Sequence, residues 1–245
     1  MSVPVRQIRA DVLKALSGPT LLTLSSLVIV VPLLIVFMSG LVDGLAFVGS
    51  AEATRTLLPI GVAGSLGCAF YGSYLVTRDD YYRGMERAFL MASPRTVFTS
   101  RVVVAALIGL AFSTAGFLLW TVATAAMLRS HDRELRIGAE VLPLAMGNLF
   151  AGALAAAIGC GIGWVVRNYY VAVVVLLILP AIIAAPMLAR LRDVERFLPV
   201  GAVAGLGGVK MDGLLAPAGA GLVLAGWTVL ALAAGWFALR RRRQV

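Results

Sequence analysis

The sequence predicts an all-α integral membrane protein that consists of one transmembrane domain, residues 1–245. Of its 245 residues, 60% are hydrophobic and only 13% are charged, whereas a soluble domain is about half apolar and a quarter charged. The apolar residues gather into runs close to the ~20 residues that a helix needs to cross a bilayer core. Runs of this length without alternation exclude barrel strands, so the backbone polar groups must be paired within helices.

Six apolar runs are long enough to be membrane spans. We expect them at residues 21–41, 57–76, 102–127, 141–166, 171–188 and 218–239. Cys68 and Cys160 fall inside two of these runs, and two isolated cysteines form neither a disulfide framework nor a metal-binding pattern. We therefore expect no metal site.

Basic residues predict the orientation, because Lys and Arg collect on the cytoplasmic side of a membrane. Thirteen of the 21 basic residues fall on one side of the predicted spans: Arg6, Arg9, Lys14, Arg78, Arg83, Arg87, Arg95, Arg101, Arg167 and Arg240 to Arg243. The other eight are Arg55, Arg129, Arg133, Arg136, Arg190, Arg192, Arg196 and Lys210. We expect both termini in the cytoplasm. Because this placement accounts for the positive charge, we expect no nucleic-acid partner.

The N-terminal residues 3–17 have the pattern of an amphipathic helix. Their apolar residues recur at helical spacing and are Val5, Ile8, Val12, Leu13 and Leu16, while Arg6, Arg9 and Lys14 are polar. Such a helix lies in the membrane interface, in contact with lipid. Whether it has a function or is only a lead-in to the first span stays open.

The polar connection at residues 77–101 predicts a short helix outside the membrane. We expect Asp79 and Asp80 to open it as an N-terminal cap and dipole partner. Ser93 and Pro94 should end it, because proline cannot continue the hydrogen-bond ladder.

This short helix has an apolar face that a partner could bind. The face consists of Met85, Ala88, Phe89 and Ala92, and Arg83, Glu86 and Arg87 surround it. A helix projecting from two rigid spans suits a partner's groove. The alternative is a solvated loop whose helix packs on its own membrane protein.

At these residues the chain resembles the permeases of type-2 ATP-binding-cassette exporters. The resemblance lies in acidic residues followed by Gly84-Met85-Glu86, then Ala92-Ser93-Pro94-Arg95, then the basic Arg101. Aspartates stand where glutamates are commoner and Arg101 where lysine is, which preserves the charge. The resemblance implies a coupling helix that contacts a separate ATPase subunit, with Asp79, Asp80, Arg83, Gly84, Met85, Glu86, Phe89, Ser93, Pro94 and Arg95 on or beside it. It also implies a second permease copy or paralogue, and ATP and Mg²⁺ held by the ATPase.

The segment 197–217 is too short in its apolar pieces to cross a membrane and is broken by Gly and Pro. We expect it on the outer face. The resemblance implies that residues 199–206 form a short helix dipping partway into the membrane, and an ordinary external loop is the alternative.

Missing groups exclude several function classes. No predicted span has an ionisable residue away from its ends, and the only histidine, His131, lies in a polar loop, so a proton relay through the membrane is not expected. Residues 205–210 contain glycines and a lysine but lack the spacing and the Ser/Thr of a phosphate loop. Ser65 lies between glycines without a histidine base. We expect no catalytic residue and no cofactor in this chain, and a close-packing role for the glycines of the spans.

A substrate path could be lined by polar residues of the spans, of which Ser113, Thr121 and Asn148 are candidates. More often such residues bond to neighbouring helices or to their own backbone. A path without charges fits an apolar or amphipathic substrate, such as a drug, a lipid or a peptide.

Two functions follow. The first is an exporter permease in a bacterial cytoplasmic membrane, energised by a separate ATPase. The second is a non-transport assembly or sensor protein whose cytoplasmic loop binds another partner.

The orientation can be tested with cysteines at Arg133 and Gln244. In intact cells an impermeant thiol reagent should label Arg133→Cys and leave Gln244→Cys unlabelled, because only the first is expected outside. Permeabilised cells, in which both should react, are the control. Equal protection of both in intact cells would contradict the predicted topology.

Overall fold

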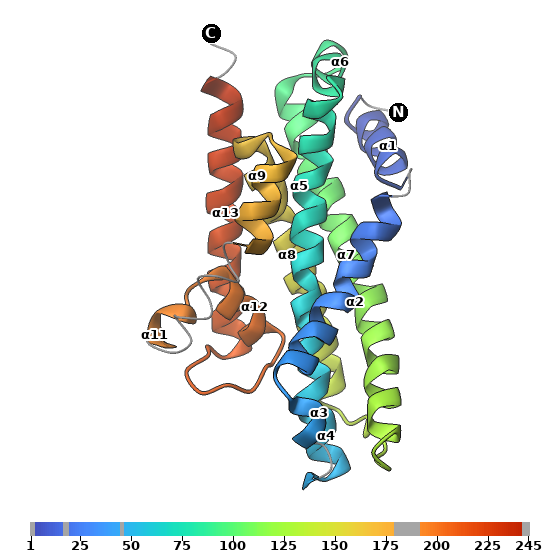
Figure 1. The fold of residues 1–245 in the computed structure, drawn as a ribbon. Helices are drawn as coiled ribbons and strands as arrows, with labels where there is room; N and C mark the ends of the chain where they lie inside the picture. The colour runs from blue at the N-terminus through green and yellow to red at the C-terminus, as the bar shows by residue number, and fades with distance from the viewer. Residues whose placement is uncertain (1–2, 17–19, 45–46, 179–191, 242–245) are drawn as a thin grey trace.

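The computed structural model describes residues 3–16, 20–44, 47–178 and 192–241, and every regular element in them is a helix. Seven elements form the N-terminal part: α1 (Val3–Leu16), α2 (Thr20–Met38), α3 (Leu41–Gly44), α4 (Ser50–Leu57), the 3₁₀ helix η2 (Leu58–Gly64), α5 (Ser65–Tyr81) and α6 (Gly84–Met91). The rest are α7 (Pro94–Arg129), α8 (Val141–Val166), α9 (Tyr169–Val173), the π-helix η3 (Val174–Ile178), α11 (Arg192–Glu195), α12 (Pro199–Leu206) and α13 (Pro217–Arg241). The long helices run side by side in one bundle (Figure 1).

Four helices in the described residues are long and apolar enough to cross a membrane. They are the continuous rod Ser50–Tyr81, α7, α8 and α13. This confirms the prediction of an all-helical chain suited to a membrane. Six crossings stay a prediction, because the apolar stretches Ser26–Met38 and Tyr169–Ile178 are shorter. The rest of the predicted fifth span, residues 179–188, lies outside the described residues.

The centre of the bundle is the contact of α5 with α8, and it depends on small residues. A Cβ atom on Gly159 of α8 would lie 1.7 Å from the carbonyl oxygen of Ala69, and one on Gly72 of α5 would lie 1.9 Å from that of Ala156. Any side chain at either position would push the two backbones apart. The close-packing role predicted for glycines of the spans is confirmed at Gly159.

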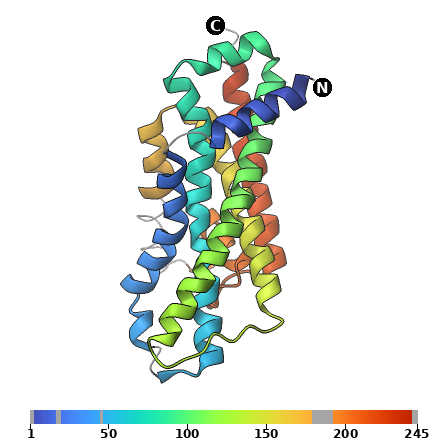
Figure 2. The same cartoon turned by 90° about the vertical axis from the view of Figure 1, so that its right-hand side faces the viewer.

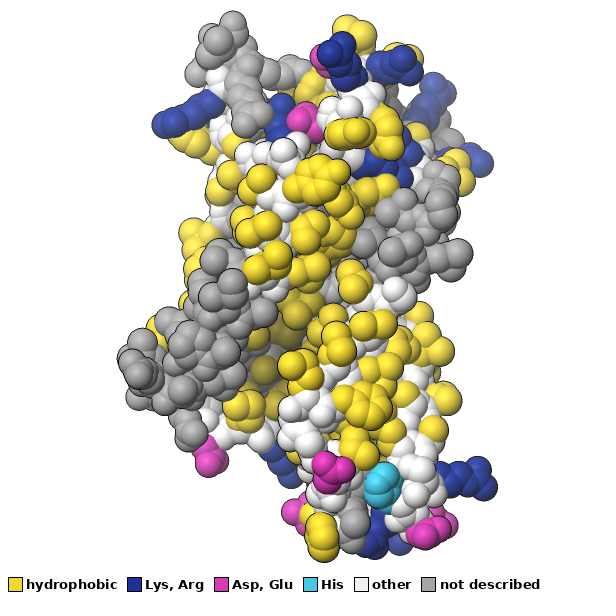
Figure 3. Space-filling view, viewed as in Figure 1, with side chains coloured by type: hydrophobic (Ala, Val, Ile, Leu, Met, Phe, Trp, Pro, Cys, Tyr) yellow, Lys and Arg dark blue, Asp and Glu magenta, His cyan; other side chains and the backbone are white. Residues whose placement is uncertain are grey.

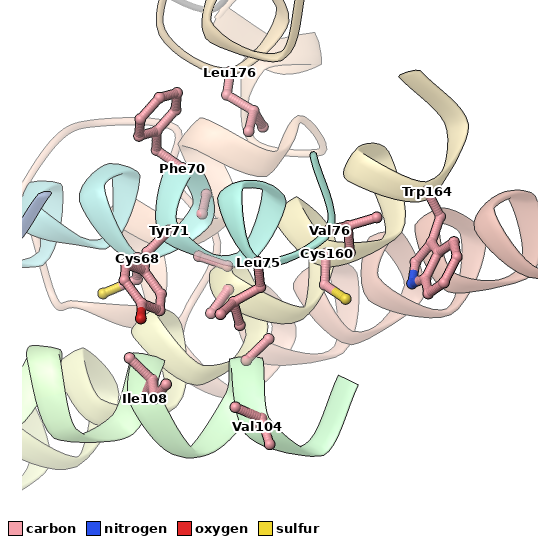
Figure 4. Packing of buried hydrophobic residues seen from close by; sticks show 14 of the residues in the cluster. Cys68, Phe70, Tyr71, Leu75, Val76, Val104, Ile108, Cys160, Trp164 and Leu176 are labelled. Carbon is pink, nitrogen blue, oxygen red and sulfur yellow. The ribbon is translucent and has the colours of Figure 1, made fainter. Parts of the chain in front are cut away.

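Larger side chains fill the space around this contact. Figure 4 shows Leu75 of α5 on the side of Val104 and Ile108 of α7, Phe70 on the opposite side of α5, and Trp164 of α8 to one side. All five are buried. The three helices therefore share one apolar core.

On the face seen in Figure 3, apolar side chains cover the middle of the molecule, and charged side chains gather at its two ends. Both ends of the described chain lie at the same end of the bundle as α6, and α1 lies across that end (Figures 1 and 2). If the bundle spans a membrane, this arrangement gives an even number of crossings; the number of six and the cytoplasmic location of the termini stay predictions. We call this the terminal end, and the other the distal end.

The distal end is held by polar contacts between α4 and the loop that follows α7. The backbone N–H of Arg136 donates to Thr54 Oγ1 at 3.2 Å, and Arg55 Nε donates to Glu140 Oε1 at 2.8 Å. This hydrogen bond from the Arg55 guanidinium lowers the pKa of the exposed Glu140 carboxyl. These two hydrogen bonds hold the loop between α7 and α8 against α4.

The short helix α12 covers residues 199–206, where the resemblance to type-2 permeases implied a short helix. Just before it, the carbonyl oxygen of Phe197 accepts a hydrogen bond of 2.8 Å from Trp227 Nε1. At the end of α12, the carbonyl oxygen of Leu206 lies so close to Gly147 of α8 that a Cβ atom on Gly147 would be only 2.1 Å from it. Trp227 is ten residues into α13, about 15 Å along its axis. The segment therefore packs against the sides of long helices, and its depth in a bilayer stays a prediction.

Gly159→Ala should lower the free energy of unfolding by about 1 to 3 kcal/mol, because overpacking a tight contact forces the backbones apart. Gly226→Ala is the matched control, since a Cβ there would meet nothing within 4 Å. Equilibrium unfolding in detergent micelles measures both variants. Equal stability of the two would show that the α5–α8 contact is looser than described.

Candidate docking site at the terminal end

The helix α6 is carried between α5 and α7 on two short connections. Arg83 joins α5 to α6 and has the left-handed backbone angle φ of 54°, a conformation that residues other than glycine adopt at a cost of about 1 kcal/mol or more. Ser93 begins α7, where its Oγ accepts a hydrogen bond of 3.2 Å from the backbone N–H of Thr96 and Pro94 follows as the first helical residue. Short connections to two long helices fix where α6 lies.

The sequence suggested that Asp79 and Asp80 open α6, and this prediction is wrong, because α6 begins at Gly84. They lie near the end of α5, which continues beyond its apolar run to Tyr81. A carboxylate at a helix C-terminus is opposed by the helix dipole, so each needs a cation. Arg101 and Lys14 bind Asp79, and Arg167 Nη1 lies 3.5 Å from Asp80 Oδ1.

The apolar face predicted for a partner is turned towards the bundle itself. Met85 is buried, and Ala88, Phe89 and Ala92 are half-buried against the apolar core. For this face the alternative expectation holds, that the helix packs on its own protein. The reason is that α5 and α7 bring core residues directly beneath α6.

A second set of apolar residues on α6 and the end of α5 is exposed instead. Leu90 is 86% and Met91 82% exposed. Tyr81 and Tyr82 are exposed as well, and their rings pack edge to face with the ring centroids 5.1 Å apart. Glu86 is exposed and lies one turn before Leu90. We call Tyr81, Tyr82, Glu86, Leu90 and Met91 the docking segment. Sequence reasoning selected only Glu86, although two apolar residues beside the α6 stripe were a usable signal.

A network of charged side chains, three of them buried, lies at the same end of the bundle as the docking segment. Arg101 Nη2 bonds to Asp79 Oδ2 and lies 3.3 Å from Asp11 Oδ1, and its Nη1 donates to the carbonyl oxygen of Leu75 at 3.3 Å. Lys14 Nζ lies 2.6 Å from Asp79 Oδ1, and Ser100 Oγ donates to Asp11. We call Asp11, Lys14, Asp79 and Arg101 the charge network.

The charge network joins three helices that are distant in sequence. Asp11 is on α1, Asp79 on α5 and Arg101 on α7, and each side chain is buried. Removing one member of a buried pair leaves an uncompensated charge, at a cost of about 3–5 kcal/mol. Sequence reasoning had not singled out Asp11, because only packing brings it to Arg101. The one signal was an acidic residue in an otherwise basic segment.

The candidate path residues have local partners. Ser113 Oγ lies 3.5 Å from Cys68 Sγ, where α7 meets α5, and is buried against Gly152 of α8. Thr121 Oγ1 donates to the carbonyl oxygen of Phe117 in its own helix at 2.7 Å. Asn148 is buried on α8, one turn before Gly152. The contacts of Ser113 and Thr121 are of the packing kind, and a substrate path through these residues stays a prediction.

A comparison with models of known protein families gave no match, and a comparison with curated proteins gave none either. The function must therefore be argued from the docking segment and the charge network.

Phe89→Ala should destabilise the folded chain, because Phe89 packs against the core. A fully buried phenylalanine loses about 3–5 kcal/mol on truncation, so we expect about 1–2 kcal/mol for this half-buried one. Leu90→Ala, the neighbouring exposed position, should change stability by less than about 0.5 kcal/mol. Unfolding in detergent compares them, and a larger loss for Leu90→Ala would contradict the described orientation of α6.

Proposed function

We propose that this chain is the permease subunit of an ATP-driven exporter in a bacterial cytoplasmic membrane, and that the docking segment binds a separate ATPase subunit. The observation that carries the proposal is the exposure of Leu90, Met91, Tyr81 and Tyr82 at a charged end of the molecule. Residues in that position face water rather than lipid. Large apolar and aromatic side chains exposed together in water mark protein interfaces.

The mounting of α6 supports force transmission. Its two neighbours, α5 and α7, are long helices that share the buried core with α8. A movement of α6 would be transmitted to the middle of the bundle through α5 and α7, because no long loop lies between them. An energy-coupling contact requires such a stiff link between the two subunits.

The charges around the docking segment indicate the partner's surface. Arg83, Arg87 and Arg95 are exposed there, and Glu86 is the only acidic side chain of the segment. We therefore expect an apolar groove in the partner, with a mostly acidic rim and one basic group that meets Glu86. Complementary charges of this kind favour association and fix register.

The chain needs a partner for energy, since its sequence has no phosphate loop. ATP and Mg²⁺ would be bound by the ATPase subunit. We further propose that a second permease copy or paralogue completes the transport unit, and that the substrate is apolar or amphipathic, a drug, a lipid or a peptide. A non-transport assembly or sensor protein is the second candidate, since the docking segment could bind another soluble partner.

The double variant Leu90→Ser/Met91→Ser should still insert and fold, yet lose ATPase binding. Truncating apolar anchors at the centre of an interface typically costs 2 kcal/mol or more, about thirtyfold in affinity. Glu86→Lys should weaken binding as well, by placing a like charge opposite the partner's basic group. Co-purification with the ATPase and substrate-stimulated ATP hydrolysis are the measurements.

Ile137→Ser is the matched control, because Ile137 is also exposed but belongs to the distal loop. It should bind and stimulate the ATPase like the parent. If the double variant does so too, the docking assignment fails. If the parent isolated gently from its native membrane carries a partner without nucleotide-binding residues, the exporter proposal fails and the second candidate gains support.

A further inference from the structure

Among the described side chains of α1, at residues 5–14, no apolar one is fully buried. Ile8 and Val12 are only half-buried against the core, and Val5 and Leu13 are exposed, Leu13 at 61%. The most buried described side chain of α1 is instead Asp11, 3% exposed. A carboxylate is costly to bury unless it is paired and hydrogen-bonded. The position of α1 therefore depends on the groups that pair with Asp11.

Arg101 is the group that links Asp11 to the rest of the bundle. Its guanidinium lies between the carboxylates of Asp11 on α1 and Asp79 on α5, and its own backbone belongs to α7. The planar fork of an arginine can bond two carboxylates at once in fixed geometry. With Lys14 included, the charge network holds two acidic and two basic groups. Losing Arg101 would leave two buried carboxylates close together, and the remaining cations, Lys14 at 2.6 Å and Arg78 at 4.0 Å, both lie beside Asp79 Oδ1.

The charge network also touches the first residue of α6. A Cβ atom on Gly84 would lie 3.5 Å from Lys14 Nζ and 3.6 Å from Asp79 Oδ1. Arg78 of α5 also contacts α1, because its Nη2 donates to the carbonyl oxygen of Lys14 at 3.1 Å. The last turns of α1 and the start of α6 thus meet at Lys14 and Asp79, the two members of the charge network that lie beside Gly84.

We propose that Arg101 is a positioning residue that fixes α1 relative to α6 by holding Asp11 and Asp79 together. A partner bound at the docking segment would then meet α1 in one defined place. The inference goes beyond the proposed function, because it concerns the chain alone and holds whichever partner binds α6.

The distance between α1 and α6 tests this proposal directly. Nitroxide labels at Leu13→Cys and Leu90→Cys are suitable, since both side chains are exposed, whereas the native Cys68 and Cys160 are buried. Pulsed electron resonance on the full chain in lipid nanodiscs should give a single narrow distance distribution for the labelled parent. In Arg101→Gln this narrow peak should be lost, because repulsion between Asp11 and Asp79 releases α1.

A second substitution separates positioning from a general loss of structure. Asp11→Asn added to Arg101→Gln removes the repulsion and leaves Asp79 with its cations Lys14 and Arg78, so the narrow distribution should return in part. Asp11→Leu alone keeps Arg101 paired with Asp79 and should broaden the distribution without unfolding the bundle. Arg9→Gln removes an exposed positive charge from the same helix and should change nothing.

Three results would overturn the proposal. The first is a parent-like distribution in both Arg101→Gln and Asp11→Leu. The second is the same broadening in Arg101→Gln with and without Asp11→Asn, which would mean that carboxylate repulsion plays no part. The third is broadening in Arg9→Gln equal to that in Asp11→Leu. If Arg101→Gln does not fold, the comparison of Asp11→Leu with Arg9→Gln decides alone.

Discussion

The close approach of α5 to α8 sets the position of every other element. Because Gly159 and Gly72 have no side chains, the two backbones touch, and the carbonyl oxygens of Ala69 and Ala156 occupy the space that Cβ atoms would need. Among apolar helices in lipid there is little hydrophobic drive to associate, so contact of this kind supplies much of the attraction. The larger residues of α5, α7 and α8 then pack around it, and α6 inherits its place from the two helices that it connects.

At the terminal end, buried ion pairs also hold the helices together. Apolar packing continues to this end through Val97, Phe98 and Met85, and beside it Arg101, Asp79 and Asp11 are buried together. Such groups stabilise a structure weakly compared with apolar residues, but they require a defined geometry. The bundle thus combines an apolar middle with an end where directional charge contacts join α1 to α5 and α7, beside α6.

Some of this was predictable from the sequence and some was not. Runs of apolar residues predicted α8 and α13 with nearly correct ends, because length and hydropathy are local properties, whereas α7 begins at Pro94, eight residues before its apolar run. The short helix at residues 3–16 also follows from local pattern, and the one at 199–206 was implied by the family resemblance. The role of Asp79 was mispredicted, since an aspartate before a short helix looks like a cap unless one knows that α5 extends to Tyr81. The orientation of α6 was mispredicted as well, because a stripe of apolar residues does not state which neighbour covers it.

The sequence by itself determined that the chain is helical and suited to a membrane, because composition and run length need no knowledge of contacts. Only the tertiary structure decided which side chains of α6 are exposed to solvent, and that residues 11, 79 and 101 form one buried network. Those facts depend on distances between segments up to 90 residues apart. Such distances arise when helices pack, and no local pattern encodes them.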